Sequence, residues 1–255
     1  MPDKINTMFA FGLSPKNAED YFRSKGYAFS WNWRDVFQEQ HNKAFTVAKV
    51  MKLDVLTDIQ ELVDKAISGK ITTAEFYKQL EPKLRAKGWW GKQEQINPKT
   101  GEVETVQLGS PWRLKKILET NMNVSYSAGR YKTQIDAASF APWWQYFDMD
   151  DARVRIVHDK IGDFFVGKVL HFKNPWWQIW YPPNDWGCRC WIRNWTEEQR
   201  LERNLEIIEE LPQWLLDLQP GEGWAHNPGA AFNPDLTKYS AELVKGIGLS
   251  REIGF

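Results

Sequence analysis

The residues best suited to chemistry in this chain are its two cysteines, Cys188 and Cys190, which are separated only by Arg189. Their thiolates could bind zinc, but tetrahedral zinc takes four ligands, and the histidines nearest in sequence are His158 and His171. A Cys-x-Cys step in a strand places both sulfurs on one face, although zinc sites more often use Cys-x-x-Cys. We therefore expect no metal or other cofactor. Both cysteines are expected to be buried, reduced thiols that pack as small hydrophobic side chains.

A second set of candidates precedes the cysteines in the sequence. Arg153, Arg155 and His158 lie just before an expected turn at Gly162. A histidine beside arginines could act as a general acid or base on a phosphodiester, with Arg155, His158 and Arg189 as the working groups. The spacing fixes no second catalytic group, however. The simpler interpretation is that these side chains hydrogen-bond to loop carbonyls, and we expect no catalytic residue.

Other catalytic and binding motifs do not occur in the sequence. It contains no Gly-rich phosphate loop, no Gly-x-Ser-x-Gly elbow and no metalloprotease helix motif. The acidic run at 148–151 is more typical of a solvated turn than of a metal site. Lys plus Arg and Asp plus Glu both number 33, and this zero net charge argues against a protein that binds nucleic acid through bulk electrostatics.

The segment that must position the cysteines is 176–190, which we call the aromatic knot. Pro182 and Pro183 remove two backbone donors and force an extended path. Gly187 then permits a tight bend just before Cys188. We predict a rigid structural unit in which indole rings pack around a strand that carries both cysteines. The rings belong to Trp176, Trp177, Trp180 and Trp186.

The chain contains 15 tryptophans and 14 phenylalanines among its 255 residues. Large aromatic side chains bury much area in cores and are also enriched at protein–protein contacts, so both interpretations stay open. Three aromatic side chains near the C-terminus are candidate partner-binding residues, namely Trp214, Trp224 and Phe232. Without a signal-peptide pattern, a membrane-length apolar run or a disulfide framework, the chain is expected to be soluble, made in a reducing cytoplasm and without membrane contact.

Helical periodicity dominates the first part of the chain. N-cap residues, a capping box and three-and-four spacing of apolar residues predict five helices. These helices begin near Ser14, Trp33, Asp54, Thr72 and Ser110, and the second extends to Met51. An Asn-Pro-Lys-Thr-Gly turn signal predicts an exposed hairpin or flap at 92–108. Asn121, on the apolar stripe of the last helix, is either a satisfied core amide or a contact to a partner.

After Pro142 the pattern changes to the alternation and the β-branched or aromatic content typical of strands. Strands are expected at 143–149 and 153–157, a strand pair at 163–172 and a further strand at 188–193. A capping box at Thr196 then predicts a helix with inward residues as far as Leu211. The expected fold class is α+β, with a mainly helical region at 1–141, a small mixed α/β unit at 142–218 and an extended C-terminal arm at 219–255.

Several separated motifs occur together in this chain. They are Arg-Val-Arg-Ile-Val-His at 153–158, Gly162, Pro-Trp-Trp at 175–177, Tyr-Pro-Pro-Asn at 181–184 and Gly-Cys-Arg-Cys at 187–190. With further matches at 31–35, 44–49, 87–91, 108–111, 120–121 and 227–229, they resemble the phage Mu F-like head morphogenesis family over most of the chain. Some relatives carry a Cys-x-x-Cys pair where this chain has Ile-Val-His at 156–158, which speaks against a four-cysteine zinc site here.

The resemblance implies a minor head (capsid) protein of a tailed, Mu-like bacteriophage that acts in prohead assembly and is not an enzyme. Its implied partners are the phage portal protein and a major capsid or scaffold protein, and contact with packaged DNA stays open. Its implied location is the virion head, after assembly in the host cytoplasm. The alternative is a nuclease or transferase-like enzyme that uses Arg155, His158 and Arg189.

Overall fold

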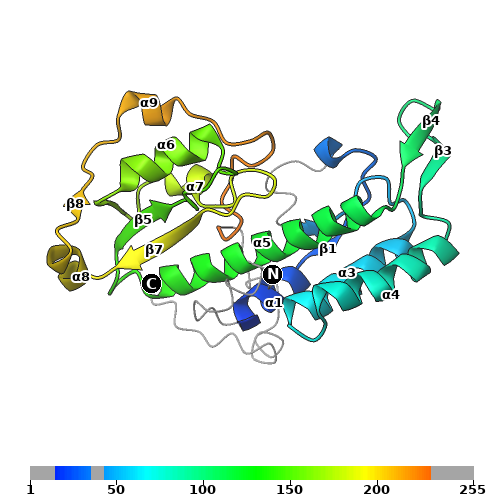
Figure 1. Cartoon of the computed structure of the whole chain (residues 1–255), viewed down its shortest axis with the longest axis horizontal. Coiled ribbons are helices and arrows are strands. Elements are labelled where there is room, and N and C mark those ends of the chain that lie inside the picture. The colour runs from blue at the N-terminus through cyan, green and yellow to red at the C-terminus, as the bar shows by residue number, and fades with distance from the viewer. Residues whose placement is uncertain (1–14, 36–42, 231–255) are drawn as a thin grey trace, which may run out of the picture.

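The computed structural model describes residues 15–35 and 43–230, and within these residues the fold is α+β. A helical half and a mixed α/β half are joined by one long helix, α5 (Pro111–Asp136), which runs along the long axis of the molecule (Figure 1). No helix among the described residues is both long enough and apolar enough to cross a membrane.

The helical half contains four helices that the apolar spacing predicted. They are α1 (Pro15–Arg23), α3 (Leu53–Ile67), α4 (Thr73–Ala86) and α5. Thr72 caps α4 in a capping box with Glu75, and the Ser110 side chain accepts the Arg113 backbone N–H at the start of α5. A short 3₁₀ turn, η3, covers Trp33–Asp35. These elements surround one hydrophobic core.

The helix predicted for 33–51 is wrong in its second part. Residues 36–42 lie outside the described residues, and strand β2 (Ala44–Phe45) follows them. It pairs in parallel with β1 (Gly26–Tyr27). Lys49 then has a φ of 63°, a left-handed conformation that a right-handed helix cannot contain. Of the apolar residues in this part, Phe45 and Val47 are buried, whereas Met51 is exposed.

A hairpin occupies the segment for which an exposed flap was predicted. Strand β3 (Lys92–Ile96) pairs antiparallel with β4 (Val103–Gln107), and the turn between them contains Gly101 at a φ of 75°. The hairpin extends from the helical half at one end of the molecule (Figure 1). At its tip Ile96 and Val103 are directly opposite each other, and both side chains are exposed.

The mixed half is built on a four-stranded sheet of order β7-β5-β6-β8. The strands are β5 (Trp143–Phe147), β6 (Lys168–His171), β7 (Trp191–Trp195) and β8 (Glu206–Ile207). Strand β5 is antiparallel to both β6 and β7, whereas β6 and β8 are parallel. The helices of this half are α6 (Ile156–Phe165), α7 (Trp177–Trp180), α8 (Glu197–Glu202) and α9 (Gln213–Leu216).

The strand predicted for 153–157 and the first strand of the pair at 163–172 are wrong, because helix α6 occupies 156–165. Its buried residues are His158, Ile161, Gly162 and Phe165, a spacing of three, four and seven. This helical period was present in the sequence but was hidden by the β-branched residues before it. Gly162 therefore lies inside a helix and not in the expected turn.

Two further boundaries differ from the predictions. The helix that starts after Thr196 ends at Glu202, because Asn204 turns the chain at a φ of 52° and β8 then pairs with β6. The strand predicted for 188–193 begins only at Trp191. Cys188 and Cys190 thus precede β7 and lie in the connection that leads into it.

Helix α5 contributes to both hydrophobic cores. Its first half supplies Leu114 and Leu118 to the core of the helical half. Its second half packs Tyr131 and Ile135 against the core of the mixed half, which contains Trp144, Trp177 and Trp180. The division proposed at residue 141 stays a prediction, because one continuous helix supports both sides of it.

The Trp177 side chain is 0 % exposed and makes edge contacts with Trp144 and Trp176 at centroid distances of 5.7 and 5.0 Å. We expect Trp177→Ala to lower the free energy of unfolding by about 3–5 kcal/mol, because it leaves a large cavity. Chemical denaturation measures this loss. Trp112→Ala is the matched control, since that ring is 67 % exposed, and a loss no larger than the control's would contradict the packing.

Candidate functional site

Helix α6 positions two of the basic residues that the sequence singled out. Arg155 is the N-cap residue of α6, and His158 lies in the first turn with only 3 % of its surface exposed. One turn later, Gly162 allows the Asp148 carboxyl group to approach, since a Cβ built on Gly162 would lie 2.7 Å from Asp148 Cγ. The glycine is therefore required by close packing of the β5–α6 connection against the helix.

The proline segment of the aromatic knot is attached to α5 by polar contacts. The Pro182–Pro183 peptide bond is cis, and Ser127 donates a hydrogen bond to the Pro182 carbonyl oxygen. The Tyr181 hydroxyl donates to Gln134 Oε1 over 2.7 Å, and Gln134 Nε2 donates to the Ile192 carbonyl over 2.8 Å. One buried glutamine thus connects α5, the knot and β7.

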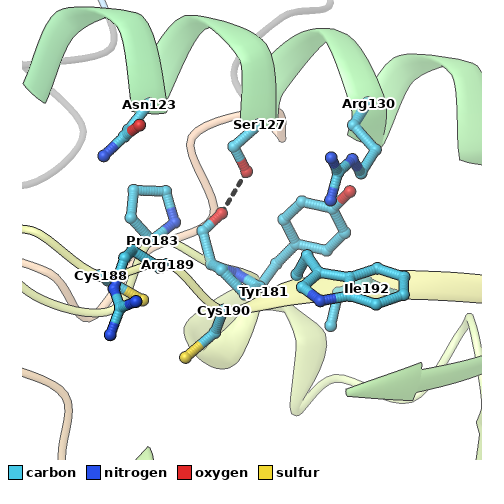
Figure 2. Close-up of a pocket in the computed structure, with 11 residues that line it drawn as sticks. Asn123, Ser127, Arg130, Tyr181, Pro183, Cys188, Arg189, Cys190 and Ile192 are labelled. Atoms are coloured by element: carbon cyan, nitrogen blue, oxygen red, sulfur yellow. Dashed lines mark hydrogen bonds between the residues drawn. The ribbon is translucent and has the colours of Figure 1, made fainter. Parts of the chain in front are cut away.

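A pocket lies between α5 and the knot. Asn123, Ser127 and Arg130 of α5 form one wall, and the 181–183 and 188–192 segments form the other (Figure 2). In Figure 2 the Cys190 sulfur points away from α5. The Cys190 thiol therefore lies on the side of the loop that faces away from α5.

The knot brings both cysteines to His158. The three side chains offer Sγ and imidazole nitrogen atoms that all lie within 4.8 Å of one another, and Cys190 Sγ is 3.5 Å from His158 Nδ1. Both cysteines are free thiols. The hydrogen bond with Cys190 and then that with His158 hold the pKa of Cys188 well below its usual value, whereas the same contact with Cys188 and burial raise the pKa of Cys190.

The arginines of the candidate catalytic set are paired with carboxylates of the same chain. Arg189 donates to both carboxyl oxygens of Asp151 over 2.6 and 2.5 Å, and this contact holds the pKa of Asp151 well below its usual range. Arg155 lies 2.9 Å from the Asp185 carboxylate and donates to the Trp186 carbonyl over 2.7 Å. Both guanidinium groups therefore stabilise the loops around the knot.

Sequence reasoning missed the partners of these residues. Asp151 and Asp185 carry no signal of their role, because their arginines lie 38 and about 30 positions away in sequence. Trp33 was also missed, although its ring packs edge-to-face on Trp186 at 5.8 Å. Trp186 in turn packs on Trp224 at 5.2 Å, so three distant segments meet at one aromatic contact.

The partner-binding candidates lie in different environments. Trp214 of α9 is 44 % exposed and packs one edge on Phe164, 5.6 Å away. Trp224 is 8 % exposed and packs on Trp186 of the same chain. Phe232 lies outside the described residues. The first part of the arm predicted for 219–255 therefore packs on its own chain. Gly229 lies so close to Tyr131 that a Cβ built on it would be 2.5 Å from the Tyr131 Cβ atom.

The Tyr181–Gln134 hydrogen bond gives a measurable prediction for the α5–knot contact. Tyr181→Phe leaves the buried Gln134 oxygen without its donor and is expected to cost about 1–3 kcal/mol of unfolding free energy. In a double-mutant cycle with Gln134→Met, denaturation should show a coupling of at least ~0.5 kcal/mol. Tyr27→Phe is the control at an exposed tyrosine. Additive losses in the cycle would contradict a direct contact.

Comparisons with known proteins identify the family. The model of the Phage Mu protein F like protein family matches residues 57–193, which include α6, the knot and most of β7. The chain is 36 % identical over 264 aligned positions to a protein of Escherichia phage Mu that is provisionally named capsid assembly protein F, covering 92 % of this chain and 59 % of that protein. No solved structure gives a significant match.

A second relative is the Mu-like prophage FluMu F protein of Haemophilus influenzae, which is 40 % identical over 235 positions, covering 81 % of this chain and 55 % of that protein. The chain thus spans somewhat more than half the length of the curated relatives it matches. The family model covers the segment in which His158, Cys188 and Arg189 are brought together. The chain belongs to the phage Mu F-like protein family.

Proposed function

We propose that this chain acts in head assembly of a tailed, Mu-like bacteriophage, as a minor head protein that works at the prohead stage. The observation that carries the proposal is the 36 % identity, over 92 % of this chain, to a phage Mu protein named for capsid assembly. The proposed location is the phage head, after assembly in the host cytoplasm. The proposed partners are the portal protein and a major capsid or scaffold protein.

The geometry of the knot supports a role in assembly more than in catalysis. A nuclease or transferase would need Arg155, His158 and Arg189 to reach a substrate. His158 is buried, and the two guanidinium groups are already paired with Asp185 and Asp151. A phosphate group would have to displace a bidentate carboxylate from Arg189, at the loss of a charge-assisted contact. We therefore propose a non-enzymatic role.

Exposed apolar side chains supply candidate docking positions for head proteins. On α9 both Trp214 and Leu216 are exposed, and Ile96 and Val103 are exposed at the tip of the hairpin. Tryptophan is enriched among the residues that dominate binding energy at interfaces. Trp214 is our first candidate anchor, because its ring is half exposed while its edge is held by Phe164.

The anchor proposal predicts that Trp214→Ala lowers the copy number of this chain in purified heads without unfolding it, because the change removes a large exposed ring. Quantitative mass spectrometry of the heads measures copy number, and thermal unfolding measures the fold. Trp112→Ala is the control, as an exposed tryptophan on a different element. Equal copy numbers for the two variants and the unaltered chain would remove Trp214 from the interface.

The C-terminal arm gives a second prediction. A chain that ends at Ala230 keeps Trp224 on Trp186 and Gly229 on Tyr131, so its unfolding midpoint should stay close to that of the full chain. If Phe232 and its neighbours dock on a head protein, the shortened chain should be depleted from heads. Chemical cross-linking in proheads should join the full chain to the portal, capsid or scaffold protein.

The enzymatic alternative has its own readout. Incubation of the purified chain with RNA and with DNA should leave both intact. Degradation that persists through purification, and that a folded Arg189→Gln variant lacks, would contradict the assembly proposal.

The truncation experiment tests a separate claim. Normal incorporation into heads of the chain that ends at Ala230 would contradict only the docking role of 231–255.

A further inference from the structure

The approach of His158 to both cysteines is the feature that the assembly role leaves unexplained. The histidine belongs to the first turn of α6, and the cysteines belong to the connection before β7, about 30 residues later. Their potential ligand atoms nevertheless all lie within 4.8 Å of one another, and none of the three side chains is exposed. Among the described residues this is the one group of histidine, cysteine and carboxylate side chains with metal-ligand spacing.

The observed spacing agrees with that around a tetrahedral ion. With zinc–sulfur bonds of about 2.3 Å and zinc–nitrogen bonds of about 2.0–2.1 Å, a tetrahedral angle separates sulfur from nitrogen by about 3.6 Å. Cys190 Sγ lies 3.5 Å from His158 Nδ1. A thiol–imidazole hydrogen bond would give a similar distance for this one pair. Such a hydrogen bond involves only one sulfur. A metal ion also accounts for the second sulfur, that of Cys188, within 4.8 Å of the other two atoms.

We propose that His158, Cys188 and Cys190 bind one zinc-class divalent ion, which joins α6 to the aromatic knot. Two thiolates and one imidazole are the soft and borderline ligands that favour zinc over magnesium or calcium. Three protein ligands leave the fourth tetrahedral position to water. This replaces the expectation from sequence that both cysteines are free thiols acting as small hydrophobic side chains.

Polar and acidic groups lie near the cluster. The buried Asn184 side chain, four residues before Cys188, accepts a hydrogen bond from Tyr146 over 3.2 Å. Asp148 lies against Gly162, one helical turn after His158 and on the same face of α6. Polar groups close to a metal site commonly orient its ligands through hydrogen bonds.

The proposed ion would have a structural effect within the knot. The 188–190 segment precedes β7, and the contacts of Arg189 with Asp151 and of Cys190 with His158 attach it to distant parts of the chain. A metal bond to His158 would fix this segment on α6 and would thereby help to position the preceding Pro182–Pro183 pair. An ion that binds only the folded state would raise the unfolding temperature.

The experiment uses the purified full chain. We expect one equivalent of zinc by elemental analysis, or one equivalent taken up when a chelator-treated chain is titrated with zinc. Cobalt(II) should bind with the same stoichiometry and show the visible bands of a tetrahedral site together with thiolate-to-cobalt charge transfer. Zinc should also protect both cysteines from a thiol reagent and raise the unfolding midpoint.

Variants assign the ligands. Cys188→Ser, Cys190→Ser and His158→Gln should each weaken zinc binding by more than the ~10–100-fold typical of changes next to a metal ligand. His171→Gln is the matched control, because His171 lies outside the cluster, and it should bind zinc as the unaltered chain does. The thiolate-to-cobalt charge-transfer bands of the unaltered chain need no variant, so they decide the proposal even where a variant fails to fold.

Three outcomes would overturn the proposal. The first is a folded chain that takes up neither zinc nor cobalt in stoichiometric amount. The second is a bound metal that leaves both thiols open to the reagent. The third is a metal that is retained by the folded Cys188→Ser and His158→Gln variants.

Discussion

The ring of Trp144 is the contact on which the arrangement of the mixed half depends. It is fully buried, and it packs on Tyr131 of α5, Phe172 beyond β6, Trp177 of α7 and Tyr181 of the knot, at centroid distances of 5.7–6.1 Å. One side chain of β5 thus contacts the long helix, the sheet and the knot together. Aromatic pairs in edge-to-face geometry add to the stabilisation from the area that such rings bury, so this cluster holds α5 against the sheet.

Around this cluster, charge pairs and close backbone approaches fix the loops. Arg189 pairs with Asp151, and Arg155 pairs with Asp185, so two arginines join the loops on either side of α6. Gly162 and Gly229 leave space that any larger side chain would fill. A loop constrained in this way presents a fixed surface, which is consistent with the proposed role in head assembly.

Much of the helical half could be predicted from the sequence. The capping box at Thr72, the N-cap at Ser110 and the apolar stripe from Val55 to Ile67 are local signals, and each corresponds to an observed helix. Prediction failed where pairing with a distant segment competes with local preference. The 44–45 strand needs β1, and the helix after Thr196 is cut short because β8 is taken up by β6.

The candidate site shows the same division. The residue types and the resemblance singled out His158, Cys188, Cys190 and the arginines, but the sequence placed the histidine between an expected strand at 153–157 and a turn at Gly162, and it predicted no metal site. His158 faces the core because residues 156–165 form a helix, and the expected strand did not include this helical period.

By itself, then, the sequence determined the α+β class, the helices with strong caps, the family and the identity of the residues in the knot, because these follow from local pattern and composition. Only the tertiary structure decided that His158 meets both cysteines, that Arg155 and Arg189 each pair with an aspartate, and that Trp224 packs on its own chain. These contacts join segments far apart in the chain, and their distances depend on how α5, α6 and the sheet pack together. No local pattern encodes that packing.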